Sequence, residues 1–441
     1  MHREINGKNH EIIKTYLDRY GVKFGIYKDN TFDERIFPFD MIPRVIEEEE
    51  YKILEKGLIQ RVKALNAFLN DIYSTQQIVK DGIIPEEFIT SSSGYFPQLC
   101  GVKPVKGIYA HISGIDLVQG KDSKWYVLED NIRVPSGASY SVVARNITRM
   151  AAPEIFKDIP IRENRHYPQM LKEMMDSVNT GGINVILTPG RSNAAFFEHA
   201  FLAEKSGAKL VFPSELEVDG EGVYFRHFSG EKIRVGAIYR RISDEFLDPL
   251  AFNPHSLLGV PNLMSAYHKG EVAIVNAVGN GVADDKGIYY FVPKMVEYYL
   301  GEEPILENAP TYLPYFEKDM QYTLENIDKL VIKDVAEAGG YGVLFGRDLS
   351  LEKREALIES IKKEPRRFIS QEIIDFKELE IISDTKTSRK ADFRAYVVMG
   401  AEEIHVWPSG LTRYTTRTDT FIVNSSQGGG FKDTWIIDSQ K

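Results

Sequence analysis

The sequence predicts an α/β protein, with α+β parts, that contains more than one domain. Three observations support this fold class: a helical period between residues 41 and 73, two apolar runs joined by a polar turn between residues 105 and 150, and strands alternating with helices between residues 180 and 275. A length of 441 residues allows two or three domains, and a hydrophobic content of 43% is enough for a large core. We expect four segments, at residues 1–104, 105–150, 151–275 and 276–441.

The composition argues against several classes of function. A net charge of −10 disfavours a nucleic-acid partner, which would need a basic face, although a few local Lys and Arg residues can still bind a small anion. One cysteine, Cys100, excludes an intrachain disulfide framework. No stretch approaches the roughly 18 apolar residues of a membrane span. We therefore expect a cytoplasmic protein with neither nucleic-acid nor membrane partners.

Residues 1–104 are predicted to be mainly helical. Between Met41 and Tyr73, leucine and valine side chains recur at spacings of three and four residues, which gives one apolar face and a charged back. We interpret this segment as a packing helix.

Residues 105–150 are predicted to form a β-hairpin, in which GIYAHISGIDLVQ and KWYVLEDNIRV flank a short polar turn. Glu129 and Asn131 lie two residues apart and face the same side of their strand, and Asp116 can lie beside them on the first strand. Two carboxylates and an amide oxygen suit Mg²⁺, which completes its shell with water and phosphate oxygens. The alternative is a polar sheet face with ordinary solvated acids.

Residues 151–275 are predicted to form a small open parallel sheet, since NVILTPG, AAFFEHAFLAEKSG and AKLVFP follow a strand–helix–strand order. Ligands of such sheets bind at the carboxyl ends of the strands. Four polar residues near these ends are candidates for substrate binding, against a surface or salt-bridge role: Ser192, Asn193, Arg240 and Arg241. Because adjacent strand residues point opposite ways, we expect at most one arginine of the pair to face the site.

Residues 276–441 carry three further patterns. Lys333 ends an apolar strand and precedes a glycine-rich loop, whose N–H groups can turn toward a phosphate; the alternative is a flexible hairpin loop with a surface lysine. A second apolar strand leads into Gln371 and Glu372, which can offer polar groups to a base and a ribose. A third strand places Asp392 and Arg394 on one face, where Arg394 could reach transferring phosphate oxygens.

The order of these patterns resembles that of the ATP-grasp superfamily, except that the Asp and Glu-x-Asn elements come first in the chain. This order is similar to that of circularly permuted ATP-grasp proteins related to glutathionylspermidine synthetases and eukaryotic-type glutathione synthetases. The resemblance is closer still to an uncharacterised type 2 group from bacteria and archaea. Its long signatures occur as VLEDNIRVPSGASY, LTPGRSNAAFFEHAFLA, IYRRISDEFLDPL, VGNGVADDKGIYYFVP, GGYGV and VNSSQGGGFKDTW.

The resemblance implies a circularly permuted ATP-grasp fold with an inserted small open parallel-sheet domain and N-terminal helices. It also implies ATP and two Mg²⁺ ions, with Asp116, Glu129 and Asn131 as metal ligands. The nucleotide-binding residues that it implies are Lys286, Lys333, Gly339, Gly340, Tyr341, Gly342, Gln371 and Glu372. Arg394 matches the arginine that stabilises the transition state, and Arg133 is assigned to a phosphate or to the acyl group.

The activity implied is that of an ATP- and Mg²⁺-dependent ligase that joins a small-molecule or peptide carboxylate to an amine through an acyl phosphate and releases ADP. One alternative is a glutathionylspermidine-synthetase-like ligase for a peptide and a polyamine, with Asp244, Glu245 and Asp248 as acids for the polyamine. Another is a catalytically silent ATP-binding scaffold for a partner protein. The sequence leaves open which substrates are joined and whether a partner enzyme or a homo-oligomer is involved.

Overall fold

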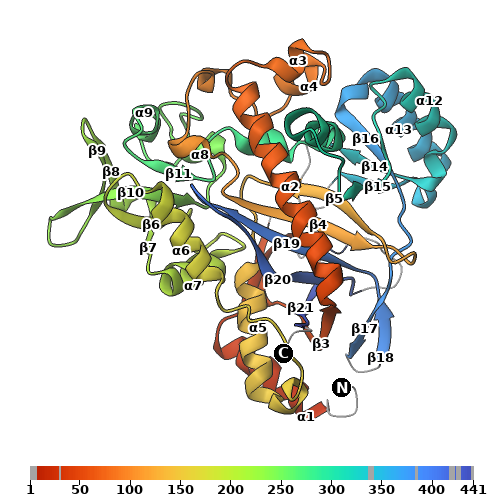
Figure 1. Ribbon diagram of the computed structural model, residues 1–441, viewed down its shortest axis with the longest axis horizontal. Coiled ribbons are helices and arrows are strands. Elements are labelled where there is room, and N and C mark those ends of the chain that lie inside the picture. Colours follow the sequence, from red (N-terminus) through yellow and green to blue (C-terminus); the bar gives the residue numbers. More distant parts are fainter. Residues whose placement is uncertain are drawn as a thin grey trace.

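A seven-stranded sheet forms the centre of the computed structural model, which describes residues 7–28, 31–335, 342–382, 386–416, 423 and 429–438 (Figure 1). Its strands run in the order β12-β5-β4-β19-β20-β21-β3. Their bounds are β3 Phe39–Ile46, β4 Ile112–Gln119, β5 Trp125–Asn131, β12 Glu307–Asn308, β19 Ala391–Met399, β20 Ile404–Tyr414 and β21 Gly430–Ile436. Neighbours are antiparallel except for the parallel pairs β12–β5 and β21–β3. The sheet therefore joins segments from both halves of the chain.

The predicted hairpin is confirmed as β4 and β5. Asp116 pairs directly with Glu129, and Gly114 pairs with Asn131, so the two acids lie side by side as the strand period required. On the other side of β4, strand β19 places Arg394 opposite Asp116. The patterns that lay far apart in the sequence thus meet on one sheet.

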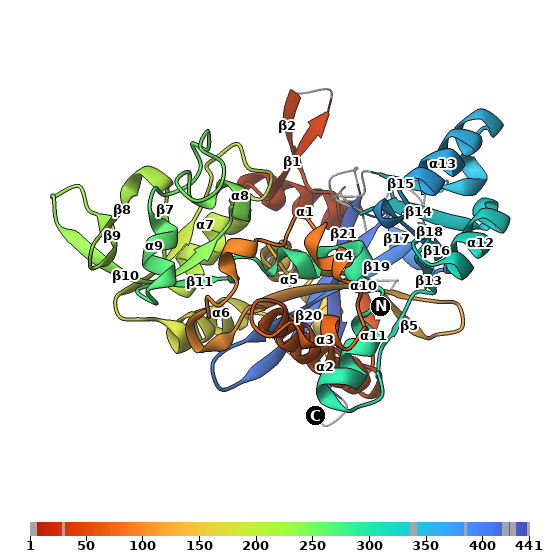
Figure 2. The ribbon, with the colours of Figure 1, turned by 90° about the horizontal axis from the view of Figure 1, so that it is seen from above.

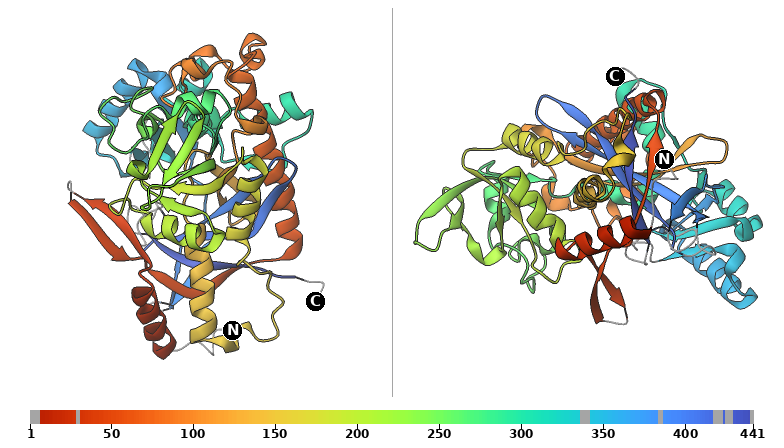
Figure 3. Two further views of the ribbon diagram at one scale, coloured as in Figure 1. Left: turned by 90° about the vertical axis from the view of Figure 1, so that its left-hand side faces the viewer. Right: turned by 90° about the horizontal axis from the view of Figure 1, so that it is seen from below.

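The N-terminal region contains helices α1 Gly7–Arg19 and α2 Glu48–Ile72, but also the hairpin of β1 Lys23–Lys28 and β2 Thr31–Ile36, which projects from the body of the molecule (Figure 2 and Figure 3). The helix expected from Met41 begins only at Glu48, because the preceding residues form β3. Pro43 is compatible with this strand, since β3 lies at the edge of the sheet and its register shifts there. The predicted apolar face of α2 is buried, with Leu54, Leu58 and Leu65 at most 1% exposed.

A six-stranded sheet lies on one flank (Figure 1). Strands β7, β6, β10 and β11 are parallel, as predicted for this segment, whereas the hairpin β8–β9 adds an antiparallel edge. The strands are β6 Ile183–Leu187, β7 Lys209–Val211, β8 Leu216–Asp219, β9 Gly222–Arg226, β10 Lys232–Arg240 and β11 Ala273–Val275. The accompanying helices are α6 Tyr167–Val178, α7 Phe196–Ser206, α8 Asp244–Leu247 and α9 Leu263–His268.

A four-stranded antiparallel sheet lies on the opposite flank (Figure 2). It contains β13 Thr311–Tyr312, β14 Leu330–Asp334, β15 Val343–Phe345 and β16 Phe368–Glu372. Helices α12 Glu317–Glu325 and α13 Leu351–Lys363 accompany it, and the sheet and α13 share a small core that includes Leu330, Leu357 and Phe368. Because this core is separate from the main one, the sheet forms a unit of its own.

The remaining elements connect these units. Three consecutive helical segments lie between residues 286 and 300: α10 Lys286–Tyr289, α11 Val292–Met295 and a π-helical turn Val296–Leu300. Short helices α3 Gln77–Lys80 and α4 Glu86–Thr90 follow α2, and strands β17 Leu379–Ile382 and β18 Lys386–Arg389 form a small hairpin. Within the described ranges, no helix is both long and apolar enough to span a membrane.

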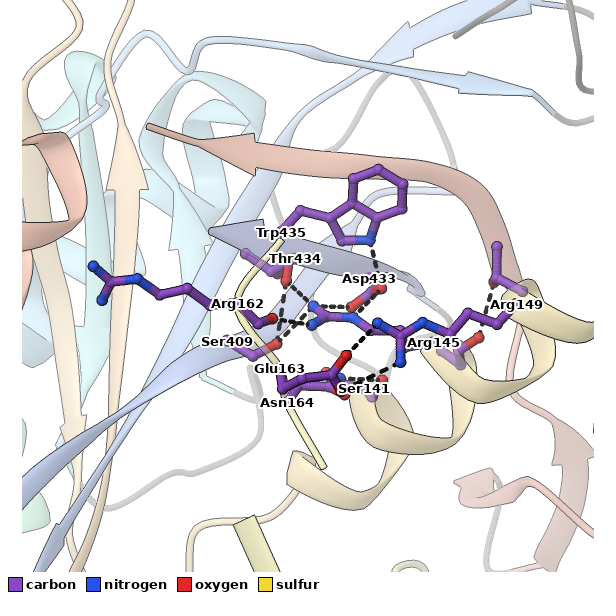
Figure 4. A network of polar contacts seen from close by, with 12 residues as sticks. Ser141, Arg145, Arg149, Arg162, Glu163, Asn164, Ser409, Asp433, Thr434 and Trp435 are labelled. Atoms are coloured by element: carbon purple, nitrogen blue, oxygen red, sulfur yellow. Dashed lines mark hydrogen bonds and ion pairs between the residues drawn. The ribbon is translucent and has the colours of Figure 1, made fainter. Parts of the chain in front are cut away.

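Helix α5 Ala138–Ala151 is fixed to the central sheet by a buried ion pair (Figure 4). Arg145 donates to both carboxylate oxygens of Asp433 on β21, at 2.8 and 2.9 Å, and to the carbonyl of Arg162 at 2.7 Å. Both side chains of the pair are at most 3% exposed. The body of α5 is thereby held independently of its N-terminal end, which follows β5.

Candidate functional site

A pocket lies between the four-stranded sheet and the central sheet, with about 820 Å³ of empty space that is partly open to solvent. Seven residues singled out from the sequence line it: Asp116, Glu129, Lys286, Lys333, Gln371, Glu372 and Asp392. Its remaining lining residues are Leu128, Val331, Val343, Phe345, Ile373, Ile374, Phe376, Arg413 and Val423. The pocket is therefore acidic on the central sheet, basic near the two lysines and largely apolar elsewhere.

The candidate metal ligands converge as the hairpin predicted. The Asn131 amide nitrogen lies 3.3 Å from an Asp116 carboxylate oxygen and 3.4 Å from a Glu129 carboxylate oxygen. Rotation of the amide by half a turn would present its oxygen in the same place. The described residues contain no cluster of three or more His, Cys, Asp or Glu side chains arranged for a metal. Two carboxylates and one amide nevertheless fit Mg²⁺, which takes its other ligands from water and phosphate.

Two arginines hold Asp116 in place. Arg394 donates to both carboxylate oxygens, at 2.6 and 2.8 Å, and Arg413 donates to one at 2.8 Å. Burial would raise the pKa of Asp116, but the Arg394 and Arg413 guanidinium groups hold that pKa well below its usual range. Arg413 also donates to Asp392 at 3.0 Å. Two acids and two arginines thus form a buried cluster with no net charge.

Arg413 was not identified from the sequence. It lies in the strand sequence LTRY, where no motif or spacing distinguishes it from a surface arginine. Its role follows only from the strand pairing, which sets it opposite Asp392. The strand pairing is therefore the feature that identifies Arg413, and it can be used only once the order of the strands in the sheet is known.

Lys333 faces the acids from β14. Burial lowers the pKa of Lys333 to about 8, and the neighbouring Lys286 ammonium acts in the same direction, whereas Glu129 and Asp116 oppose it. Lys286 is the first residue of α10 and lines the same pocket. The pocket therefore sets two lysines opposite the Asp116 and Glu129 carboxylates, a charge arrangement that can accept a phosphate chain and its metal.

Only part of the predicted glycine-rich loop is described. Gly342 adopts a left-handed conformation, with φ near +70°, directly before β15. Gly339, Gly340 and Tyr341 lie outside the described residues. Their predicted contact with phosphate stays a prediction.

Gln371 and Glu372 lie at the end of β16, at the pocket's apolar wall. The Gln371 amide donates to Thr311 at 2.9 Å, and Glu372 accepts from the Tyr312 hydroxyl at 2.7 Å and from the Tyr322 hydroxyl at 3.2 Å. These contacts fix both side chains. The backbone of this strand end and the apolar side chains around it offer a slot suited to a flat base.

Arg133 does not line the pocket. Its guanidinium lies 3.7 Å from Asp284 and 4.0 Å from Glu245, and Asp284 also accepts the backbone N–H groups of Ile132 and Arg133 at 2.5 and 3.0 Å. Burial raises the pKa of Asp284 to about 6, although Arg133 opposes this shift. The structure thus places Arg133 among acids beside the pocket, and its assignment to a phosphate or acyl group stays a prediction.

The four substrate candidates lie outside the pocket. Arg240 is fully buried and donates to Asp244 at 3.1 Å and to three backbone carbonyls. Arg241 is 3% exposed and pairs with Glu198 at 3.2 Å. Asn193 accepts the N–H of Ala195 in the turn before α7, next to Ser192. Both arginines have internal partners, an arrangement that favours a structural or positioning role over contact with substrate.

Comparisons with known proteins agree with this architecture. A family model described as circularly permuted ATP-grasp type 2 matches residues 43–415. An uncharacterized Synechocystis sp. protein is 46% identical over 98% of this chain and 91% of its own length, and one from Mycobacterium leprae is 39% identical over 98% and 77%.

Two further similarities are more distant or partial. A Frankia alni protein named putative glutamate–cysteine ligase is 38% identical over 94% of this chain, which spans only 48% of that relative. Among solved structures, a glutathione synthetase-like effector from Globodera pallida matches with a TM-score of 0.59 and 9% identity, over 97% of this chain and 96% of that chain. At this identity the match supports the fold alone.

Proposed function

This chain belongs to the circularly permuted ATP-grasp type 2 family, whose members are ATP-grasp ligases, and we propose that it is an ATP- and Mg²⁺-dependent carboxylate–amine ligase. In this proposal ATP phosphorylates a carboxylate, and an amine then displaces the phosphate to form an amide. ADP and phosphate are released. The substrates are a small-molecule or peptide carboxylate and an amine.

One observation carries the proposal. Asp116 and Glu129 on the central sheet share a pocket with Lys333 and Lys286, beside an apolar slot at the end of β16. Phosphoryl transfer needs positioning and charge neutralisation more than covalent help from the protein. A base in the slot would direct its phosphates toward the lysines and the acids, which is the arrangement that the reaction requires.

Each residue then has a defined task. Glu129, Asn131 and Asp116 would hold Mg²⁺, which supplies positive charge to the phosphate oxygens. Lys333 and Lys286, which line the pocket, would offset the charge on the phosphates, and Arg394, which binds the pocket residue Asp116, would stabilise the transferring group. In the first step a bond forms between the substrate carboxylate and the γ-phosphorus while the bond to ADP breaks. In the second, the amine bonds to the acyl carbon, phosphate leaves, and the amine loses a proton.

The polyamine alternative is less well supported. Asp244 bonds to Arg240 at 3.1 Å and to the N–H of Gly279 at 2.9 Å. Asp248 accepts three backbone N–H groups, at 2.9 to 3.1 Å. Only Glu245 of the three predicted acids is substantially exposed, at 47% of its side chain, and Arg133 is 4.0 Å away. These residues therefore do not make an acidic site for a polycation.

The experiment combines Mg-ATP, hydroxylamine as a surrogate amine, and pools of amino-acid, peptide and other carboxylates. The name of the Frankia relative motivates the amino-acid pool, although it describes a protein of which this chain covers about half. Glu129→Ala removes a pocket acid, and Glu204→Ala, an exposed acid on α7, is the control outside the pocket. ADP and a hydroxamate in one pool, lost in Glu129→Ala and kept in Glu204→Ala, would support the proposal. ATP binding without ADP release in any pool would favour the silent scaffold.

A further inference from the structure

A buried chain of polar contacts connects the flanking six-stranded sheet to Arg394. Its middle is the 135–137 loop, formed by Pro135, Ser136 and Gly137 between β5 and α5. The loop lies between side chains of the central sheet on one side and side chains of the six-stranded sheet on the other.

The central sheet contacts the loop through one carbonyl. The Ser136 carbonyl accepts from Arg394 at 3.2 Å and from the Tyr396 hydroxyl at 2.7 Å. The packing here leaves no spare room, because a Cβ on Gly137, where φ is +125°, would lie 2.5 Å from the Tyr396 hydroxyl. A Cβ on Gly114 would lie 2.8 Å from Pro135. A shift of the loop therefore moves the Ser136 carbonyl, which accepts a hydrogen bond from the Arg394 guanidinium.

The six-stranded sheet contacts the same loop through Glu198 and Arg241. Glu198, on α7, is 1% exposed and accepts the N–H groups of Gly137 and Ser139 at 2.8 and 3.1 Å, so it caps the N-terminus of α5. Arg241, directly after β10, donates to the Pro135 carbonyl at 2.9 Å, to the Ser136 hydroxyl, and to Glu198 at 3.2 Å. The two residues neutralise each other and hold both ends of the loop.

We infer that Glu198 and Arg241 are positioning residues that set the place of the Arg394 guanidinium through the Ser136 carbonyl. Asp116 fixes one side of that guanidinium, and the loop carbonyl fixes another. The position of the carbonyl depends on Glu198, because the loop and α5 amides have it as their acceptor. The six-stranded sheet is thereby coupled to the arginine that the proposed function assigns to the transferring phosphate. This role rests on the proposed function only for its effect on turnover.

The test is a double-mutant cycle between Glu198→Gln and Arg394→Lys. Misplacing a catalytic group lowers the rate of the chemical step more than it weakens substrate binding. Glu198→Gln should therefore lower kcat for Mg-ATP turnover about tenfold, while KM for ATP changes less than about twofold. If Glu198 acts through Arg394, the double variant should be no slower than Arg394→Lys alone. A double variant slowed by the product of the two single effects would overturn the inference.

The matched control is Asp433→Asn, which breaks the buried Arg145 pair on the same helix α5 (Figure 4). It should lower the melting temperature but leave kcat unchanged, because the described hydrogen bonds of Asp433 go to Arg145 and Trp435 and not to the 135–137 loop. If kcat falls as much in Asp433→Asn as in Glu198→Gln, the loss in Glu198→Gln is explained by general destabilisation, and the inference is contradicted.

A second readout does not require turnover. The melting-temperature losses of Glu198→Gln and Arg394→Lys should be less than additive when combined, whereas those of Asp433→Asn and Arg394→Lys should add. Additive losses in both pairs would overturn the inference even if no substrate has been found. Absence of turnover in the wild-type protein would instead count against the proposed function. Should Glu198→Gln fail to fold, Arg241→Lys keeps the charge but loses the forked contacts, and the same cycle applies.

Discussion

Asp116→Asn gives the sharpest test of the charge cluster in the pocket. The substitution keeps the shape of the side chain and removes one of two negative charges that neutralise Arg394 and Arg413. Arg413 keeps the Asp392 carboxylate, but Arg394 loses its carboxylate partner and keeps neutral acceptors alone among the described residues, the Ser136 carbonyl and the amide oxygen of the new side chain. Breaking a buried ion pair from one side costs about 3–5 kcal/mol, and we expect a loss of that size in the free energy of unfolding.

The location of the cluster adds a second expectation. Asp116 and Arg413 line an open pocket, so inorganic phosphate can reach the exposed positive charge in the variant. At ten times its Kd, phosphate would restore about 1.4 kcal/mol. Asp433→Asn is the control: its carboxylate is equally buried and also pairs with an arginine, but it is not part of this pocket.

The assay is chemical denaturation of the wild type and both variants, with and without phosphate, followed by tryptophan fluorescence and circular dichroism. Phosphate should stabilise Asp116→Asn more than the wild type and more than Asp433→Asn. A loss below about 1 kcal/mol in Asp116→Asn would show that the cluster is not charge-balanced as described. Equal stabilisation of the two variants by phosphate would show that the anion acts on the protein surface in general.

Three further predictions concern the same pocket. Because the pKa of Lys333 is about 8, the side chain is charged below that pH and neutral above it. The affinity for ATP, measured by calorimetry, should therefore fall as the pH rises through 8. In Lys333→Arg the side chain stays charged, and this pH dependence should be abolished. Glu129→Gln should raise the Mg²⁺ concentration for half-maximal turnover by about tenfold or more, and an unchanged Mg²⁺ titration would remove Glu129 from the metal site. Gly137→Ala should cost about 1–3 kcal/mol of unfolding free energy through its clash with Tyr396, whereas Gly207→Ala, with nothing within 4 Å, should cost less than Gly137→Ala in the same denaturation experiment.

The sequence could predict what depends on local spacing. The strand period and the short turn predicted Asp116 beside Glu129, and the observed register pairs these two residues directly. The βαβ rhythm likewise predicted the parallel strands of the flanking sheet. Short-range geometry decides these features, and the sequence contains it.

Features that depend on distant pairing could not be predicted in this way. Met41 lies in a strand rather than in the helix expected there, because β3 pairs with β21 from the far end of the chain. Arg413 joins Asp116 from 297 residues away, and no local pattern marks it. For Arg240 and Arg241 the sequence left substrate binding and a salt-bridge role both open, because it cannot tell that Asp244 and Glu198 would pair with them in the interior.

The order of strands in the central sheet also bears on how the protein is made. Asp116 and Arg394 are neighbours in the sheet but are separated by 278 residues, and Arg413 is farther still. During synthesis all strands of the flanking six-stranded sheet, which lie within residues 183–275, emerge before the strands that pair with the β4–β5 hairpin. These later strands are β12 and β19. Domains generally fold as units as they emerge, and long-range pairing is slow. Asp116 is therefore synthesised long before the arginines that neutralise it, so a truncated chain that ends before residue 391 would carry Asp116 without either of them.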